Sequence, residues 1–300
     1  MKRTAIIGLG TVTKYYLKGM QESETLKLVA VCDSNLDAAS REVFSSYPFY
    51  LDYRKMLEQE SIEVLIISTP PVTHFEIASY ALSRGVDVIC EKPIVLSMAE
   101  YGALLEIARK GGSRLEAMYH WQNGIEVLYF NEKYDKKKIQ EIHTTVLDPY
   151  SADGCVIDMQ KRKLMGTWID SGVNILSMIK TWLPFDSLEI KGVETQTCPE
   201  SGLPVYVNAS LVIDGIPTYI TIDWRLHTNS KSSYVIYDGR RVDINHSGQC
   251  IGDGENSIDV GVMERMQQHY YNFFKRFNGN TDEDASLRIH RFLLEVNDKI

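Results

Sequence analysis

The chain has 300 residues, with 32 Lys and Arg against 40 Asp and Glu, which gives a formal charge of −8. Its 44% hydrophobic and 24% charged residues are typical of a globular protein, and the length predicts about two domains that bury their cores without disulfides or metals. A disordered chain and a mini-protein are excluded. Basic clusters such as 136–138 are only three residues long, so we expect no nucleic-acid partner.

No apolar run approaches the roughly 20 residues that span a bilayer, so we expect no membrane segment. The charged start is followed by only three apolar residues before Gly8, which argues against a secretory signal. The five cysteines are an odd number, widely scattered and without a Cys-x-x-Cys pair. We therefore expect a reduced, cytoplasmic protein without a metal site.

Up to about residue 118, short β-branched runs alternate with helical patterns. Strands are predicted at 3–7, 26–32, 64–67, 86–89 and 114–118, and helices at 12–20, 36–44, 72–83 and 97–109. Ser97 and Glu100 form a capping box at the start of the last helix. This alternation predicts an α/β Rossmann domain over 1–120, with a doubly wound parallel sheet covered by helices on both faces.

Beyond about residue 120, strands with a period of two and Gly-containing turns replace this pattern. Strands are expected at 139–147, 188–197, 204–213, 216–224, 232–237 and 240–245, and helices at 172–182, 262–277 and 284–296. The short turns indicate antiparallel neighbours. We predict an α+β domain over 121–300 with a large, mostly antiparallel sheet.

A glycine-rich segment directly follows the first predicted strand. The run from Gly8 to Thr13 has the G-x-G-x-x pattern, although Thr13 stands where a third Gly or Ala is usual. Gly8 and Gly10 allow a tight turn and the close approach of a pyrophosphate to the N–H groups at the helix start. A simple glycine turn is the alternative. The order of strand, glycines, helix and second strand favours a dinucleotide site.

Asp33 ends the second predicted strand, 23 residues past Gly10. An acid at this place holds the ribose hydroxyls of a dinucleotide. It would repel a 2′-phosphate, and the next residues, Ser34 and Asn35, supply no arginine to compensate. The sequence therefore favours NAD over NADP. A helix cap or a turn acid is the alternative role for Asp33.

Two further segments follow later strands of the same predicted sheet. Ser68 to His74 comes after strand 64–67, and Glu91-Lys92-Pro93 comes after strand 86–89. Together with the two glycines, these segments resemble the Gfo/Idh/MocA family of NAD(P)-dependent oxidoreductases, whose T-P-x-x-x-H and E-K-P elements have this spacing. The resemblance extends over the whole chain, because the C-terminal half of that family is a mostly antiparallel sheet that binds a small-molecule substrate.

Lys92 is the first catalytic candidate. Its ammonium group can hydrogen-bond a substrate hydroxyl and exchange a proton with it, and the resemblance implies this role. A surface lysine in a turn stiffened by Pro93 is the alternative. Cofactor contacts are expected from Gly8, Gly10, Thr11, Val12, Asp33, Ser34, Thr69, Pro70, His74, Glu91 and Lys92.

The segment from Gly166 to Asn174 looks like the G-G-x-x-x-D-x-G-x-H element of the same family. Asp170 falls on the family's catalytic carboxylate, with helix capping as its alternative, and Asn174 replaces the usual histidine. At i and i+4 the two project from the same side of a helix start. An asparagine orients a hydroxyl but is no acid or base at neutral pH. Proton removal then rests on Lys92 and Asp170, on a water, or on neither.

Within the family, an asparagine at this position is similar to the aldose 1-dehydrogenases, which oxidise sugars such as L-arabinose and D-galactose at the anomeric carbon. Three short segments, 117–120, 222–225 and 266–270, resemble parts of those enzymes. We therefore expect His120 and Asn174 to bind sugar hydroxyls and Trp224 to stack on a pyranose face. A structural role at the domain junction is the alternative for His120, and a core position for Trp224.

The leading expectation is an NAD-dependent dehydrogenase that oxidises C1 of an aldose to a lactone. One alternative is chemistry at another ring carbon of a sugar or an inositol. The other is a non-catalytic regulator that senses NAD and a sugar, which Asn174 in place of histidine motivates. The resemblance also implies that the open face of the second sheet pairs with another copy, in a homodimer or homotetramer.

Overall fold

The computed structural model describes residues 1–21, 23–253, 256–277 and 282–300. The chain divides into two compact units, Met1–Met118 with Tyr270–Ser286, and Tyr119–His269 with Leu287–Ile300. The predicted boundary near residue 120 lies close to the observed division. The sequence-based division differs at the C-terminus, because residues 270–286 belong to the first unit and not to the second.

The first unit is built on a six-stranded sheet in the order β3-β2-β1-β4-β5-β6, with every pair parallel. The predicted doubly wound sheet is thereby confirmed. Its strand β4 is buried along its whole length, as expected for a strand covered on both faces. The elements are β1 (Lys2–Ile7), α1 (Thr13–Gln21), β2 (Leu26–Cys32), η1 (Leu36–Ser40), η2 (Glu42–Phe44), β3 (Phe49–Tyr50), α2 (Tyr53–Gln59), β4 (Val64–Ile67), η3 (Pro71–Thr73), α3 (His74–Leu82), β5 (Asp87–Glu91), α4 (Met98–Gly111) and β6 (Leu115–Met118).

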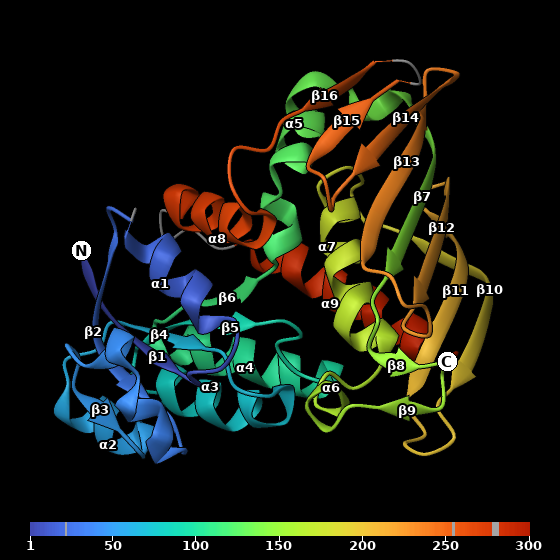
Figure 1. The fold of residues 1–300 in the computed structure, drawn as a ribbon. Helices are drawn as coiled ribbons and strands as arrows, with labels where there is room; N and C mark the ends of the chain where they lie inside the picture. Colours follow the sequence, from blue (N-terminus) through green and yellow to red (C-terminus); the bar gives the residue numbers. More distant parts are fainter. Residues whose placement is uncertain (22, 254–255, 278–281) are drawn as a thin grey trace. The chain divides into compact units, whose positions relative to one another are not determined.

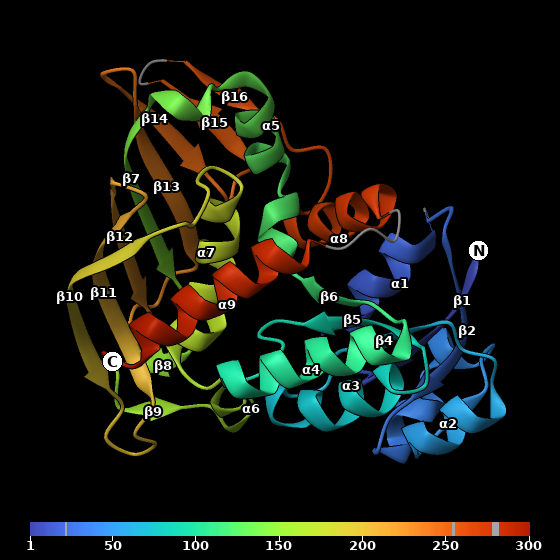
Figure 2. The same ribbon diagram turned by 180° about the vertical axis from the view of Figure 1, so that it is seen from behind.

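Helices α3 and α4 lie side by side along one face of this sheet (Figures 1 and 2). The predicted cap of α4 is present, because the Ser97 side chain accepts a hydrogen bond of 3.2 Å from the Glu100 amide. The helix predicted over 36–44 is wrong. This segment forms two 3₁₀ turns, η1 and η2, and Leu36 and Val43 are 64% and 55% exposed. Without a continuous apolar stripe to bury, an α-helix gains little there.

The returning segment from Tyr270 completes the first unit by packing on α1. A Cβ on Gly19 would lie 2.6 Å from the Phe274 ring, so this glycine allows a close approach of the two helices. The Tyr16 ring meets the Tyr270 ring edge-on, with centroids 4.9 Å apart. These contacts explain why a segment far along the sequence belongs to the Rossmann unit.

The second unit contains an eight-stranded sheet in the order β10-β11-β12-β7-β13-β14-β15-β16. Only the β12–β7 pair is parallel, so the mostly antiparallel sheet is confirmed. The elements are η4 (His120–Asn123), α5 (Ile125–Lys133), η5 (Lys136–Lys138), β7 (Ile139–Leu147), β8 (Ser151–Ala152), β9 (Val156–Ile157), α6 (Met159–Arg162), the π-helix η6 (Trp168–Gly172), α7 (Val173–Lys180), β10 (Leu188–Thr197), β11 (Pro204–Ile213), β12 (Ile216–Asp223), β13 (Ser230–Tyr237), β14 (Arg240–Asn245), β15 (Cys250–Gly252), β16 (Ser257–Asp259), α8 (Arg265–Arg276) and α9 (Glu283–Asn297), the last two shared with the first unit.

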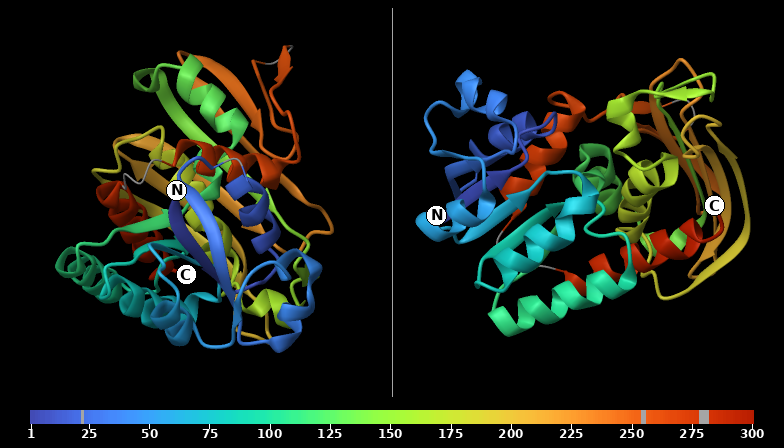
Figure 3. Two further views of the ribbon diagram at one scale, coloured as in Figure 1. Left: turned by 90° about the vertical axis from the view of Figure 1, so that its left-hand side faces the viewer. Right: turned by 90° about the horizontal axis from the view of Figure 1, so that it is seen from below.

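Helices α7 and α9 lie on one side of the eight-stranded sheet, and no helix of the described residues lies on the other (Figures 1 and 3). The Trp168 indole donates a 2.9 Å hydrogen bond to the Leu293 carbonyl, and the Phe185 and Phe292 rings stack with centroids 4.7 Å apart. These contacts join α9 to η6 and to the loop before β10. In the part of the chain that the structure describes, no helix combines the length and apolar character needed to cross a membrane.

Candidate active site

The glycine-rich loop between β1 and α1 has the geometry of an anion cradle. Gly8 has φ +87°, and a Cβ there would lie 2.7 Å from the Ser68 and Thr69 backbone, so only glycine fits. A Cβ on Gly10 would meet nothing within 4 Å. Among the described residues, nothing accepts a hydrogen bond from the N–H groups of Gly10, Thr11 and Val12. These features fit the pyrophosphate of a dinucleotide at the start of α1.

Asp33 contacts this loop directly. Its Oδ2 accepts a 2.7 Å hydrogen bond from the Leu9 amide, and its Oδ1 accepts one of 2.8 Å from the Asn35 amide. Asp33 is not the residue that caps η1. Asn35 has that role, because its side chain accepts a hydrogen bond from the Asp37 amide. Sequence reasoning missed Arg41, whose Nη1 donates to the Leu9 carbonyl. An arginine therefore contacts this loop, although it lies beyond Ser34 and Asn35, the two residues directly after Asp33.

His74 braces two loops from the interior of the first unit. Its side chain has no exposed surface, its Nδ1 lies 3.0 Å from the Pro93 carbonyl oxygen, and its Nε2 lies 2.8 Å from that of Thr69. Burial lowers the pKa of His74, although hydrogen bonds to both carbonyls oppose the change. The sequence predicted a cofactor contact here. The structure instead gives His74 a bracing role, because a side chain with no exposed surface has none to offer a ligand.

The Glu91 carboxylate accepts hydrogen bonds from two buried tyrosines. Its Oε1 accepts hydrogen bonds of 2.9 Å from the Tyr16 hydroxyl and 2.6 Å from the Tyr270 hydroxyl. Burial, followed by the charge of Glu91, raises the pKa of both tyrosines, so both remain donors at neutral pH. Glu91 was predicted to contact the cofactor, but this geometry makes it an anchor for the end of β5. The sequence held no signal for the pair, because the partners are 75 and 179 residues away.

Lys92 is therefore presented by a turn that is held on both sides. It follows β5 directly, is half-buried, and precedes Pro93 through a cis peptide bond. Glu91 is anchored by the two tyrosines, and the Pro93 carbonyl lies against His74. Side chains held on such supported turns at the carboxyl end of a parallel sheet are suited to precise contact with a ligand.

The anchor can be tested by removing one hydroxyl group. Tyr270→Phe deletes a donor to a buried carboxylate, and we expect it to lower the free energy of unfolding by about 1.5–3 kcal/mol. Tyr271→Phe, a half-buried neighbour on the same helix, is the matched control. Urea unfolding followed by far-ultraviolet circular dichroism measures both. Equal midpoints for the two variants would show that the Glu91 contact contributes nothing.

In the second unit, Asp170 lies in the middle of the π-helical turn η6, directly before α7. Asp170 is half-buried and Asn174 is 6% exposed. The Asn174 amide donates a 3.2 Å hydrogen bond to the Asp170 main-chain carbonyl, and its Oδ1 has no hydrogen-bond partner among the described residues. Asp170 is thus inside a helical turn and not at its start, so the capping alternative does not describe it. Local π-turns often occur at functional sites.

A buried ion pair that sequence reasoning missed shares the charge environment of Asp170. The Lys231 Nζ lies 2.7 Å from Asp148 Oδ1, and the side chains are 9% and 4% exposed. Burial raises the pKa of Asp148, which Lys231 partly offsets, and the negative charge of Asp170 raises it further. Burial lowers the pKa of Lys231. A lysine at an inward position of the alternating strand β13 was the available signal.

The remaining two predicted substrate residues are both buried. His120 is 6% exposed, and its Nδ1 lies 3.0 Å from Nδ1 of His269. Trp224 has no exposed surface and packs edge-on against Tyr150, with centroids 5.2 Å apart. Stacking on a sugar requires an open ring face, so the structure favours the core alternative for Trp224. No group of three or more His, Cys, Asp or Glu among the residues described could hold a metal ion.

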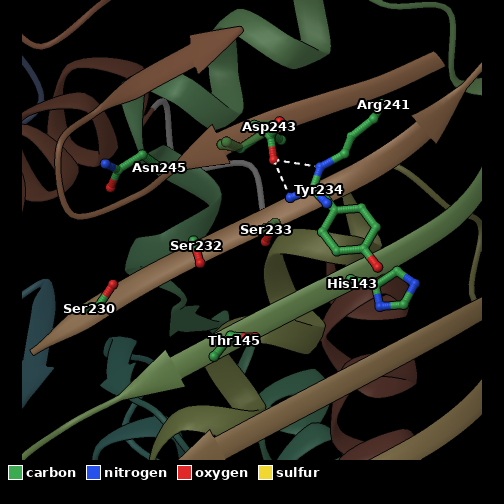
Figure 4. Close-up of a pocket in the computed structure, with 10 residues that line it drawn as sticks. His143, Thr145, Ser230, Ser232, Ser233, Tyr234, Arg241, Asp243 and Asn245 are labelled. Carbon is green, nitrogen blue, oxygen red and sulfur yellow. Dashed lines mark hydrogen bonds and ion pairs between the residues drawn. The ribbon is translucent and has the colours of Figure 1, made fainter. Parts of the chain in front are cut away.

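A depression of about 250 Å³ lies on the helix-free face of the eight-stranded sheet and contains none of the predicted site residues (Figure 4). His143 stacks between Tyr219 and Tyr234, with centroids 4.5 and 4.1 Å apart. The Arg241 guanidinium lies 3.9 Å from the Tyr234 ring centroid, and it pairs with Asp243 at 2.6 Å. This cross-strand ladder gives the outer face an aromatic and polar character.

Comparison with known proteins shows what the first part of the chain is similar to. Residues 2–119 match the family model described as an oxidoreductase family with an NAD-binding Rossmann fold. The model that these residues match is that of the Gfo/Idh/MocA oxidoreductases. D-glucoside 3-dehydrogenase of Escherichia coli is 27% identical over 194 residues, which cover 62% of this chain and 55% of that protein. Inositol 2-dehydrogenase of Salmonella paratyphi B is 26% identical over 142 residues, or 46% of this chain and 39% of that protein.

The match therefore spans about half, or less, of the length of these relatives. A solved structure, in contrast, superimposes on nearly the whole chain. A point mutant of KijD10, a 3-ketoreductase from Actinomadura kijaniata in complex with TDP-benzene and NADP, superimposes with a TM-score of 0.83 at 17% identity, over 99% of this chain and 97% of that one. The NAD expectation agrees with the NAD-binding fold that the matching model describes, and the KijD10 structure contains NADP.

Proposed function

We propose that this protein is an NAD-dependent dehydrogenase that acts on a CH–OH group of a sugar. The observation that carries the proposal is the presentation of Lys92, which is half-buried between an anchored Glu91 and a braced Pro93 at the end of β5. A lysine that only improved solubility would not need such support. The proposal assigns Lys92, Asp170 and Asn174 to one reaction.

The roles follow from the chemistry of each side chain. The loop from Gly8 to Val12 and Asp33 would hold NAD⁺, which supplies the hydride acceptor. Lys92, as the neutral amine, accepts a hydrogen bond from the reacting hydroxyl, takes its proton as the hydride leaves the carbon, and becomes an ammonium group. The Asp170 carboxylate and Asn174 Oδ1 are acceptors, and they orient the sugar through hydrogen bonds from its other hydroxyls. Because Asn174 replaces a histidine, the reaction needs a hydroxyl that loses its proton readily.

The anomeric hydroxyl of an aldose is more acidic than an ordinary alcohol, so we propose C1 as the reacting carbon and a lactone as the product. A second candidate is oxidation at another ring carbon. It is favoured by the names of the relatives, which are a glucoside 3-dehydrogenase and an inositol 2-dehydrogenase. Both candidates use the same residues and differ only in how the ring is oriented.

The test is a panel of aldoses, alkyl glucosides and inositols with NAD or NADP, followed by the absorbance of reduced nicotinamide. We expect turnover with NAD and at least one free aldose, and a product that reacts with hydroxylamine as a lactone. Turnover of alkyl glucosides or inositols alone would favour the second candidate. Calorimetric binding of NAD without turnover of any compound would contradict an enzyme and favour a sensing regulator.

We further propose that a second copy of the chain covers the helix-free face of the eight-stranded sheet. The ladder of Tyr219, His143 and Tyr234 supports this, because aromatic side chains and arginines are enriched in protein interfaces. Light scattering in solution is expected to give the mass of a dimer or tetramer, and a monomer would contradict the proposal. The free cysteines support a reducing compartment, for which we propose the cytoplasm.

A further inference from the structure

The structure brings a positive charge to the glycine-rich loop of the first unit. Arg41 lies between the 3₁₀ turns η1 and η2, and it is exposed. Its Nη1 donates a hydrogen bond to the Leu9 carbonyl. Among the described residues this is the one hydrogen bond of the guanidinium, and no carboxylate forms an ion pair with it. A cation with unused donors therefore lies at the surface beside the loop.

Leu9 is the residue at which Arg41 and Asp33 meet. The Leu9 amide donates a hydrogen bond of 2.7 Å to Asp33 Oδ2, and the Leu9 carbonyl accepts the one from Arg41. Both contacts are made to backbone atoms of a single residue, so the carboxylate and the guanidinium flank the same point of the loop. Leu9 itself lies between Gly8 and Gly10. The charges of both side chains therefore act on a ligand that the loop holds.

The two side chains suit different parts of a dinucleotide. A carboxylate only accepts hydrogen bonds, and ribose hydroxyls can donate them. The Asp33 oxygens also accept from the Leu9 and Asn35 amides, which fix the direction of the carboxylate. A guanidinium is always charged and has five N–H donors in a planar fork, a geometry that matches a phosphate. Arg41 commits one of these donors to Leu9.

Asp33 by itself would select NAD, because its negative charge repels a phosphate on the ribose 2′-oxygen. Ser34 and Asn35, which directly follow Asp33, carry no charge to compensate. Arg41 supplies that charge from further along the chain, because it shares Leu9 with Asp33. A phosphate at this place gains charge-assisted hydrogen bonds from Arg41, which offset the repulsion from Asp33.

We propose that Arg41 is a cofactor-specificity residue that binds the 2′-phosphate of NADP, so that the site accepts NADP as well as NAD. Asp33 holds the ribose of NAD, and the free donors of Arg41 are engaged only when the phosphate is present. The proposal rests on the proposed function for a dinucleotide in the loop from Gly8 to Val12. It deepens that function by naming the residue that widens the choice of cofactor.

Binding can be measured without any sugar, by calorimetry with NAD and with NADP. For the unchanged protein we expect two dissociation constants that differ by no more than about tenfold. Arg41→Met removes the charge and the donors, so it should weaken NADP binding about tenfold or more and leave NAD binding within about threefold. Arg84→Met is the matched control. Arg84 is also exposed and donates to a main-chain carbonyl, that of Tyr80, but it precedes β5 and so lies at the opposite end of the sheet.

Two nucleotide fragments test the phosphate itself. Adenosine 2′,5′-bisphosphate differs from adenosine 5′-monophosphate only by the 2′-phosphate, and both are measured in competition with NAD. The bisphosphate should bind the unchanged protein at least as tightly as the monophosphate, and Arg41→Met should reverse that order. Arg41→Lys should give an intermediate result, because an ammonium group keeps the charge without the fork.

Equal losses of NAD and NADP affinity in Arg41→Met would overturn the proposal, because Arg41 would then contact the pyrophosphate or only support the loop. NADP binding to the unchanged protein that is more than about tenfold weaker than NAD binding would also overturn it. If both dinucleotides bind as expected but no sugar turns over, the proposed function fails while the role of Arg41 stands. If a sugar turns over and NADP does not bind, the proposed function stands and the role of Arg41 fails.

Discussion

Lys92→Met is expected to lower kcat by about 10²-fold or more, because proton transfer by a positioned side chain contributes roughly 10²–10⁴-fold to a rate. The affinity for NAD, measured by calorimetry, should remain close to that of the unchanged protein. Methionine keeps much of the length and the apolar stem of lysine, and the anchors on Glu91 and Pro93 do not involve the Lys92 ammonium.

A second variant distinguishes proton transfer from simple charge. Lys92→Arg keeps a positive charge, but a guanidinium does not deprotonate in proteins. We expect it to remain as impaired as Lys92→Met, whereas recovery would show that only charge is required. Lys110→Met is the control, because Lys110 is exposed and pairs with Glu106 in the preceding turn of α4. Activity within tenfold of the unchanged protein in Lys92→Met would remove Lys92 from the mechanism.

Lys231→Met is expected to cost about 3–5 kcal/mol of unfolding free energy, because it leaves Asp148 as a buried charge without its cation. All four tryptophans lie in the second unit, so tryptophan fluorescence during urea unfolding reports on the unit that contains the pair. The double variant Lys231→Met with Asp148→Asn should recover part of the loss. Lys191→Met, at an exposed pair with Glu189, should leave the midpoint unchanged.

The loss in Lys231→Met should also depend on pH. Burial already raises the pKa of Asp148, and removing Lys231 takes away the charge that lowers it. A carboxyl whose pKa is higher in the folded than in the unfolded state favours folding when protonated, and that contribution is lost as the pH rises through the folded pKa. The variant should therefore be less impaired at pH 5 than at pH 8. Equal losses at both values would show that Asp148 is not left as a buried charge.

The arrangement of strands could largely be predicted from the sequence, because it depends on local periodicity. Strands β4, β7, β10, β11 and β14 begin and end at the predicted residues, β4 from a short apolar run and the others from strand-like patterns in the second half of the chain. Helix α5 was missed because Glu126, a charged residue, occupies an inward position of its buried face. A buried carboxylate interrupts the apolar stripe by which an amphipathic helix is identified.

Candidate residues on motifs were predictable for a related reason. Lys92 and Asp170 belong to short segments whose spacing is visible in the sequence: Lys92 directly follows β5, and Asp170 lies within η6, just before α7. The sequence did not show what the other residues of these motifs do. His74 and Glu91 belong to the same motifs, yet the structure buries one and engages the other with two tyrosines. A motif indicates that a residue matters, but not whether it contacts a ligand or supports one that does.

Length, composition and charge pointed to a two-domain globular protein without a nucleic-acid partner, and the motifs pointed to the family whose model matches residues 2–119. Only the tertiary structure decided how the polar groups are paired. Tyr270 reaches Glu91 across 179 residues, and His269 reaches His120 across 149. The physical reason is that a buried polar group must find its partner in space, whereas sequence periodicity reports only which face of an element is buried.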